Sequence, residues 1–225
     1  MRALIIASAI FAAGCMTAQG AADQSAPFTN TEAPAAGASE LPAYPASVDL
    51  PAGVYRLDPR HATVIFRIRH MGLSWFTARF DTEAGELTLD PEDPSRSRVT
   101  ASLDATSVNT GVLNRDGERA FDRQIARALG AERTPQITFT STSIERTGAH
   151  TARVTGDLTM NGQTYPAVLV VTFDGAAVDP LRGGQTVLGF SAHGQIDRSQ
   201  WGVTEWSAFA GNEVQIVIEA EFVKT

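Results

Sequence analysis

The sequence predicts an all-β domain: an extended antiparallel β-barrel of about eight strands with one short amphipathic helix. Apolar and polar residues alternate with a period of two through most of the chain after residue 53, which is typical of strands with one buried face. Short turns such as Asn161–Gly162 separate these segments and favour antiparallel neighbours. Closing such a sheet into a barrel removes its exposed edges, and eight strands leave room for side chains or one slender ligand.

The first residues have the pattern of an export signal. Arg2 supplies a positive charge, and residues 3–13 form an uncharged, mainly apolar run that is too short to cross a bilayer. We therefore expect residues 1–14 to be a signal peptide and the protein to be located in the periplasm.

Cys15 follows this apolar run and is the one cysteine in the chain, which excludes an internal disulfide and a metal site built from several thiolates. The segment 12–15 resembles the lipobox of bacterial lipoproteins, with Ala12 where leucine is usual. We expect Cys15 to be lipidated and to anchor the protein to the membrane of the cell envelope. The alternative is cleavage after residues 18–20, which would leave a soluble periplasmic protein.

Residues 15–53 are rich in Ala, Pro, Ser and Thr and carry little apolar surface to offset the entropy of ordering. This segment is predicted to be a disordered tether. The folded domain is then predicted to span residues 54–225, which is large enough to form a core without disulfides.

The predicted strands follow from the alternation. In the first, residues 64, 66 and 68 are apolar and share a face, while Arg67 and Arg69 lie on the other face. The same pattern recurs at 99–103, 154–160 and 214–222, and further strands are predicted near 74–81, 84–90, 136–144, 164–174 and 186–197. The total is about nine strands.

One segment has the period of a helix instead. Phe121, Ile125 and Leu129 recur at every fourth position, Asp116 is placed to cap the amino end, and Gly130 to cap the carboxyl end. We expect this helix to lie over one end of the barrel and to plug or gate it with its apolar face.

Composition excludes several functions. The net charge of -7 argues against a nucleic-acid-binding surface. The domain has no catalytic cysteine, no Gly-x-Ser-x-Gly elbow and no His-Glu-x-x-His segment. We predict no metal, no cofactor and no catalytic residue.

The four histidines are the side chains that titrate near neutrality. His70 continues the inward row of residues 64–68, so it is predicted either to contact a ligand head group or to be a hydrogen-bonded core residue. His193 is predicted to point outward, His150 to be solvated in a hairpin loop, and His61 to make a structural hydrogen bond in the turn that follows Asp58.

Taken together, the motifs of residues 54–225 resemble the YceI-like family of lipid-binding proteins. The segments that carry the resemblance are 55–61 (YRLDPRH), 64–70 (VIFRIRH), 107–110 (SVNT), 115–116 (RD), 135–141 (PQITFTS), 156–162 (GDLTMNG), 189–190 (GF) and 197–202 (DRSQWG). The chain departs from the family pattern at Gly117–Glu118, where a His–Leu pair is usual, and in the segment 125–133, which looks longer than usual.

The resemblance implies a lipocalin-like barrel, commonly periplasmic, whose apolar interior binds polyisoprenoid chains, isoprenoid quinones or fatty amides, without an established catalytic activity. The predicted ligand-binding residues are Phe66, Ile68, His70, Phe76, Phe80, Leu103, Phe121, Phe139, Phe190 and Trp201. For aromatic loop residues such as Trp201, filling the core is the competing interpretation.

Three hypotheses follow. The first is a non-enzymatic carrier or store for an apolar isoprenoid lipid held inside the barrel. The second is an enzyme or redox partner that acts on a bound isoprenoid quinone, and it requires His70 to meet another titratable group. The third is an envelope lipoprotein with a solidly packed barrel that serves as an interaction surface. A homodimer is compatible with each of them.

Overall fold

The computed structural model describes residues 50–225. The predicted signal peptide, Cys15 and nearly all of the predicted tether lie outside the described residues. Within residues 50–225, no helix has both the length and the apolar character needed to cross a membrane.

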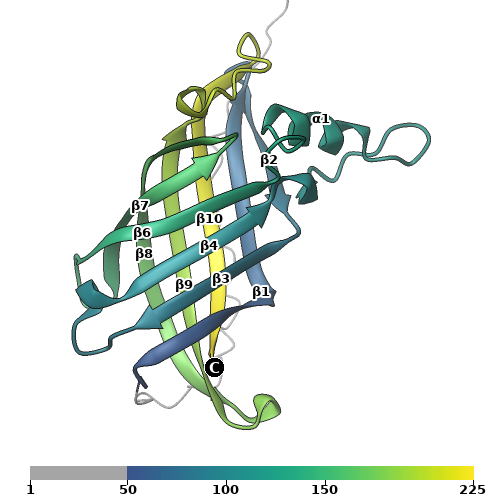
Figure 1. The fold of residues 1–225 in the computed structure, drawn as a ribbon. Coiled ribbons are helices and arrows are strands. Elements are labelled where there is room, and N and C mark those ends of the chain that lie inside the picture. Colours follow the sequence, from purple (N-terminus) through teal and green to yellow (C-terminus); the bar gives the residue numbers. More distant parts are fainter. Residues whose placement is uncertain (1–49) are drawn as a thin grey trace, which may run out of the picture. The chain divides into compact units, whose positions relative to one another are not determined.

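Ten strands form one antiparallel sheet (Figure 1). The sheet closes because β10 pairs with β1 as well as with β9. The closed ring contains eight of the ten strands, since β2 and β5 lie outside it, and the predicted eight-stranded barrel is confirmed. The strands are β1 (Gly53–His70), β2 (Ser74–Phe80), β3 (Glu83–Leu89), β4 (Arg98–Asp104), β5 (Val108–Asn109), β6 (Gln136–Arg146), β7 (Thr151–Met160), β8 (Gln163–Asp179), β9 (Gln185–Asp197) and β10 (Ala210–Lys224).

The first strand, β1, has two different partners along one edge. Residues 53–56 pair with β3, and residues 64–70 pair with β2. Its register with β10 shifts between Leu57 and Ala62, around Pro59, which has no N–H to donate to a ladder. The two-residue strand β5 pairs with β2 and was not predicted, because two residues carry no readable alternation.

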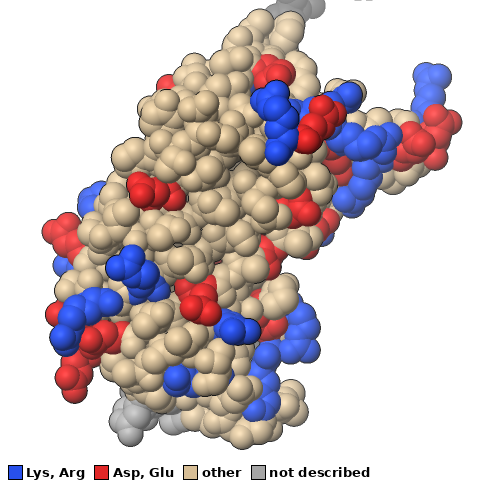
Figure 2. All heavy atoms as spheres, in the orientation of Figure 1, with Lys and Arg blue, Asp and Glu red and all other residues tan. Residues whose placement is uncertain are grey.

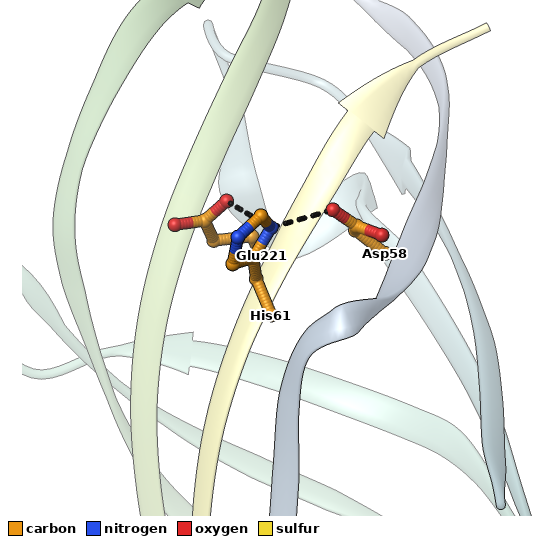
Figure 3. Close-up of side chains that lie close together, drawn as sticks. All are labelled: Asp58, His61 and Glu221. Atoms are coloured by element: carbon orange, nitrogen blue, oxygen red, sulfur yellow. Dashed lines mark hydrogen bonds and ion pairs between the residues drawn. The ribbon is translucent and has the colours of Figure 1, made fainter.

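An ion-pair network holds this irregular part of β1 (Figure 3). The Nδ1 atom of His61 lies 2.7 Å from Asp58 Oδ2 and 3.5 Å from Glu221 Oε2 on β10, and Arg182 also pairs with Asp58. The predicted structural hydrogen bond of His61 is confirmed. Asp58, His61 and Glu221 are grouped closely enough to hold a metal ion. Since Arg60 and Arg182 already neutralise the Asp58 carboxylate, we interpret the group as an ion-pair network instead.

This network predicts an acid-sensitive contribution to stability. Burial raises the pKa of Asp58, but hydrogen bonds from His61 and the Arg60 backbone, with the charge of Arg182, lower it overall to about 2. A carboxyl whose pKa falls on folding stabilises the native state above its unfolded pKa and loses this contribution as the pH falls towards 2. Asp58→Asn is expected to cost about 2 kcal/mol at pH 7. Urea unfolding at several pH values should show this gap closing between about pH 4 and pH 2, and a gap that does not change with pH would contradict the assignment.

The helix α1 (Ala120–Ala128) is shorter at its amino end than predicted. The prediction of Asp116 as N-cap was wrong: the N-cap position is Arg119, which makes no capping hydrogen bond with its side chain. Asn114 Oδ1 accepts from the backbone N–H groups of Asp116 and Glu118 and forms a separate turn there. The carboxyl end is as predicted. Gly130 has a left-handed φ of 79°, and the bond from Ala131 N–H to the Ala126 carbonyl completes a Schellman motif.

Four short 3-10 helices join strands at sharp corners. In each, an aspartate immediately before the helix accepts a hydrogen bond from a backbone N–H inside it. They are η1 (Pro94–Arg96), η2 (Ala105–Ser107), η3 (Pro180–Arg182) and η4 (Arg198–Trp201).

Candidate functional site: an apolar cavity along the barrel

The barrel interior holds two adjoining chambers. The upper chamber, at the α1 end, has a volume of about 830 Å³, and the lower chamber has a volume of about 480 Å³. Both have mainly apolar walls. Six residues line both chambers, and we call them the waist: Val64, Ala101, Leu103, Phe139, Leu169 and Ile218. A solidly packed barrel, the third hypothesis, does not fit this interior.

The alternation in the sequence identified the inward faces correctly. The rows predicted from 64–68, 99–103 and 214–222 all line the chambers. Their side chains come from β1, β4 and β10, so the wall is built from strands far apart in the sequence.

Nine of the ten predicted ligand-binding residues lie in the chamber walls. His70 lies in the upper wall and is exposed to solvent. The upper chamber has Phe66, Ile68, His70, Phe76, Phe80 and Phe121; the waist has Leu103 and Phe139; the lower chamber has Phe190. Whether they contact a ligand remains a prediction.

Trp201 is the exception, and the structure corrects its placement. Its side chain is 1% exposed and lines neither chamber. The indole N–H donates to the Leu158 carbonyl at 3.0 Å, and the ring packs edge-on against Tyr165. Trp201 therefore belongs to the core, because burial with a satisfied N–H leaves it nothing to offer a ligand.

Two glycines make room for two waist side chains. A Cβ atom on Gly156 would collide with the ring of Phe139, and one on Gly194 would lie 2.8 Å from a methyl carbon of Leu169. Because these glycines lack a Cβ atom, the Phe139 ring and the Leu169 methyl group can lie against the neighbouring strands β7 and β9.

Three segments surround the outer end of the upper chamber: the β1–β2 turn, the residues from Thr110 to α1, and the loop 203–209. The ring of Phe121 on α1 packs edge-on against Phe76 of β2 and against Trp206 of the loop. The helix thus joins the two sides of this opening with its apolar face, in line with the position expected from the sequence.

Arg198 fixes the loop 203–209. Its side chain is 5% exposed and donates hydrogen bonds to the backbone carbonyls of Val203, Glu205, Ala210 and Gly211. Burial lowers the pKa of this guanidinium, and the charges of Glu205 and Asp197 oppose that shift. The carbonyls of both ends of the loop are therefore held by one side chain, a role that the sequence did not reveal.

We expect Arg198→Met to release this loop. Four backbone carbonyls would lose their donor, so unfolding free energy should fall by about 3 kcal/mol. The change should be visible as faster proteolysis within 203–211 and a lower melting temperature. The control is Arg182→Met, which removes an arginine at the other end of β9. This change should leave the rate of proteolysis within 203–211 unchanged. Equal protease resistance of the Arg198 variant and the wild type would contradict this role.

One carboxyl group lies in the lower chamber wall. Glu83 was not singled out in the sequence, yet it lines the chamber, and its buried Oε2 atom has no hydrogen-bond partner. Burial raises its pKa, and Asp81 raises it further, while Arg79 lowers it. His150, predicted to be solvated, is exposed as expected but also lines this chamber and stacks on Phe173.

Charges of both signs are mixed on the face of the molecule drawn in Figure 2. Figure 2 shows Lys and Arg on one face in small groups mixed with Asp and Glu, without a continuous basic band on the face in view. This agrees with the net charge of -7.

Residues 55–222 match the family model of the YceI-like domain. The chain belongs to the YceI-like family. It is 35% identical to Protein YceI of Salmonella arizonae over 175 residues. These aligned residues make up 77% of this chain and 88% of that protein.

Solved structures show the same fold as this YceI-like barrel. BcnA of Burkholderia cenocepacia has a TM-score of 0.63 at 22% identity, over 73% of this chain and 98% of that one. The YceI protein of Campylobacter jejuni has a TM-score of 0.58 at 23% identity, over 70% of this chain and 90% of that one. A domain from Saccharophagus degradans described as polyisoprenoid-binding has a TM-score of 0.52 at 12% identity, over 78% of this chain and 100% of that one.

Proposed function

We propose that this protein binds and carries, or stores, an apolar isoprenoid lipid of the polyprenyl or quinone type inside the barrel, as a periplasmic protein anchored through Cys15. The observation that carries the proposal is the pair of apolar chambers joined at the waist. Family membership supports a binding protein rather than an enzyme, and the description of the Saccharophagus degradans domain supports the ligand class.

The energetics favour a long hydrocarbon ligand. Each buried CH₂ group contributes about 0.8 kcal/mol, so several isoprene units bind without polar contacts. Each chamber is within the usual size range of small-molecule sites, and together they form an elongated site. The acid–base pair required by the enzyme hypothesis receives no support within residues 50–225, where His70 has no side-chain hydrogen bond or ion pair.

Native mass spectrometry of the protein purified from its own host tests this proposal. The expected result is a bound isoprenoid lipid that is retained under gentle ionisation and released by activation. A protein that is always ligand-free, and that also rejects added quinones and polyprenols, would refute the proposal.

Glu83 gives a prediction about the stability of the barrel. The ionised carboxylate in an apolar wall opposes both folding and hydrocarbon binding, so Glu83→Leu is expected to raise the unfolding free energy by about 1 kcal/mol at pH 7. An acid whose pKa is raised by folding destabilises the native state when ionised, so the advantage should shrink as the pH falls towards 4. Glu86→Leu, on the same strand but outside the chamber walls, serves as control in thermal unfolding at pH 4 and pH 7.

A further inference from the structure

Six large apolar side chains project into solvent around the outer end of the upper chamber. They come from the β1–β2 turn, from the segment before α1 and from the loop before β10. We call them the mouth rim: Met71, Leu73, Val112, Leu113, Trp206 and Phe209. Their exposed fractions run from 42% for Trp206 to 78% for Leu73.

The three segments are held together. The backbone N–H of Met71 donates to the Phe209 carbonyl at 2.6 Å, which ties the β1–β2 turn to the last loop. Phe121 packs against Trp206 and links α1 to the same loop. Val112, Trp206 and Phe209 also line the upper chamber, so the exposed apolar rim is continuous with the apolar interior.

The backbone is strained where it holds two of these side chains outward. Met71 and Trp206 have φ values of 52° and 56°, in the left-handed region that non-glycine residues rarely adopt. Within residues 50–225 only one other non-glycine residue, the turn residue Asn161, has a positive φ. Strain of this kind persists where the surrounding structure fixes it, and it is concentrated at functional sites.

The chemistry of the rim fits a lipid bilayer. A cluster of exposed apolar side chains costs solubility unless it meets an apolar partner. Next to the rim, Arg67 and Arg69 lie over the ring of Trp75 at 5.0 and 4.7 Å, and tryptophan flanked by arginine is suited to the membrane–water interface. In the sequence directly after Leu113, Arg115 and Arg119 flank Asp116 and Glu118, so the charge next to the rim is mixed and matches zwitterionic headgroups.

We propose that the mouth rim inserts into the headgroup region of a zwitterionic bilayer. The upper chamber then opens towards the acyl chains, and a water-insoluble ligand passes between membrane and barrel without crossing water. The docking itself rests on the rim, while the passage of ligand rests on the function proposed above.

The test uses the full mature chain with Cys15→Ser, so that a lipid anchor cannot account for binding. Flotation with phosphatidylcholine vesicles is compared for this protein and for Leu73→Glu/Leu113→Glu, which changes two rim residues that do not line the chamber. The control is Val178→Glu/Leu181→Glu, since these residues are 53% and 95% exposed at the β8–β9 connection. Circular dichroism and melting temperature establish that all variants are folded.

We expect the rim variant to lose at least tenfold in vesicle binding, the control to bind like the parent, and 1 M salt to leave the parent's binding unchanged. Absence of flotation by the parent, equal flotation of the rim variant, or a rim-dependent dimer in sedimentation without vesicle binding would overturn the proposal. Loading with a polyprenol from detergent separates the two proposals. A rim variant that loads normally but does not float supports docking, whereas a parent that floats but never loads refutes only the proposed ligand function.

Discussion

Ala101→Trp is expected to divide the cavity at the waist and to shorten the hydrocarbon chain that the protein can hold. Ala101 has the smallest side chain of the six waist residues, and an indole there would fill the passage. Each CH₂ group excluded from the lower chamber costs about 0.8 kcal/mol, so affinity for long polyprenols should fall more than tenfold. Ligands of two or three isoprene units, held in the upper chamber alone, should bind as before.

Competition of polyprenols of increasing length against a fluorescent fatty-acid probe measures this effect. Thr100→Trp, on the same strand but with its side chain on the exposed outer face, is the matched control. An equal loss of affinity at every ligand length, with the fold intact, would contradict a passage through the waist. Unchanged binding of the longest ligands would contradict it as well.

Gly156→Ala is expected to be the most damaging single methyl group that can be added to the barrel wall. The new Cβ atom would lie 2.6 Å from the carbonyl oxygen of Thr140 and would collide with the Phe139 ring. The carbonyl belongs to the paired strand β6 and cannot move without breaking the ladder, so unfolding free energy should fall by about 3 kcal/mol.

Urea unfolding measures that loss. Gly189→Ala is the control, because its Cβ atom would have no neighbour closer than 3.8 Å and should change the unfolding free energy little. If the Gly156 variant folds, the displaced Phe139 ring should also narrow the waist and weaken long-chain binding. A Gly156 variant as stable as the Gly189 variant would contradict this prediction, because it would show that β6 and β7 can shift apart at little cost in free energy.

The alternation of apolar residues was sufficient to predict the barrel and most of the cavity wall, because side-chain direction in a strand follows from sequence position alone. Phe66 and Ile68 could be placed in this way. Trp201 could not, because it lies in a 3-10 helix whose direction is set by long-range packing. Glu83 has a polar side chain at an inward position, so alternation alone gave no reason to single it out.

Other features depend on contacts between distant residues. Arg198 looks like an ordinary surface arginine until four carbonyls of the following loop are placed around it. Gly156 was predicted to lie in a strand, but the reason for a glycine at that position is apparent only when Phe139 lies against it. The helix start was misplaced because Asp116 has the right side chain for a cap, while Asn114 forms a competing turn with the same backbone.

The pairing of β1 with β10 has a consequence for how the protein folds. The strand that begins at Gly53 has its partner at residues 210–224, so the barrel closes only when nearly the whole domain is available. Contacts so far apart in the chain form slowly, because the loop entropy is lost before the contacts are gained. A chain emerging from the ribosome therefore lacks the strand that completes the ladder until residues 210–224 are made.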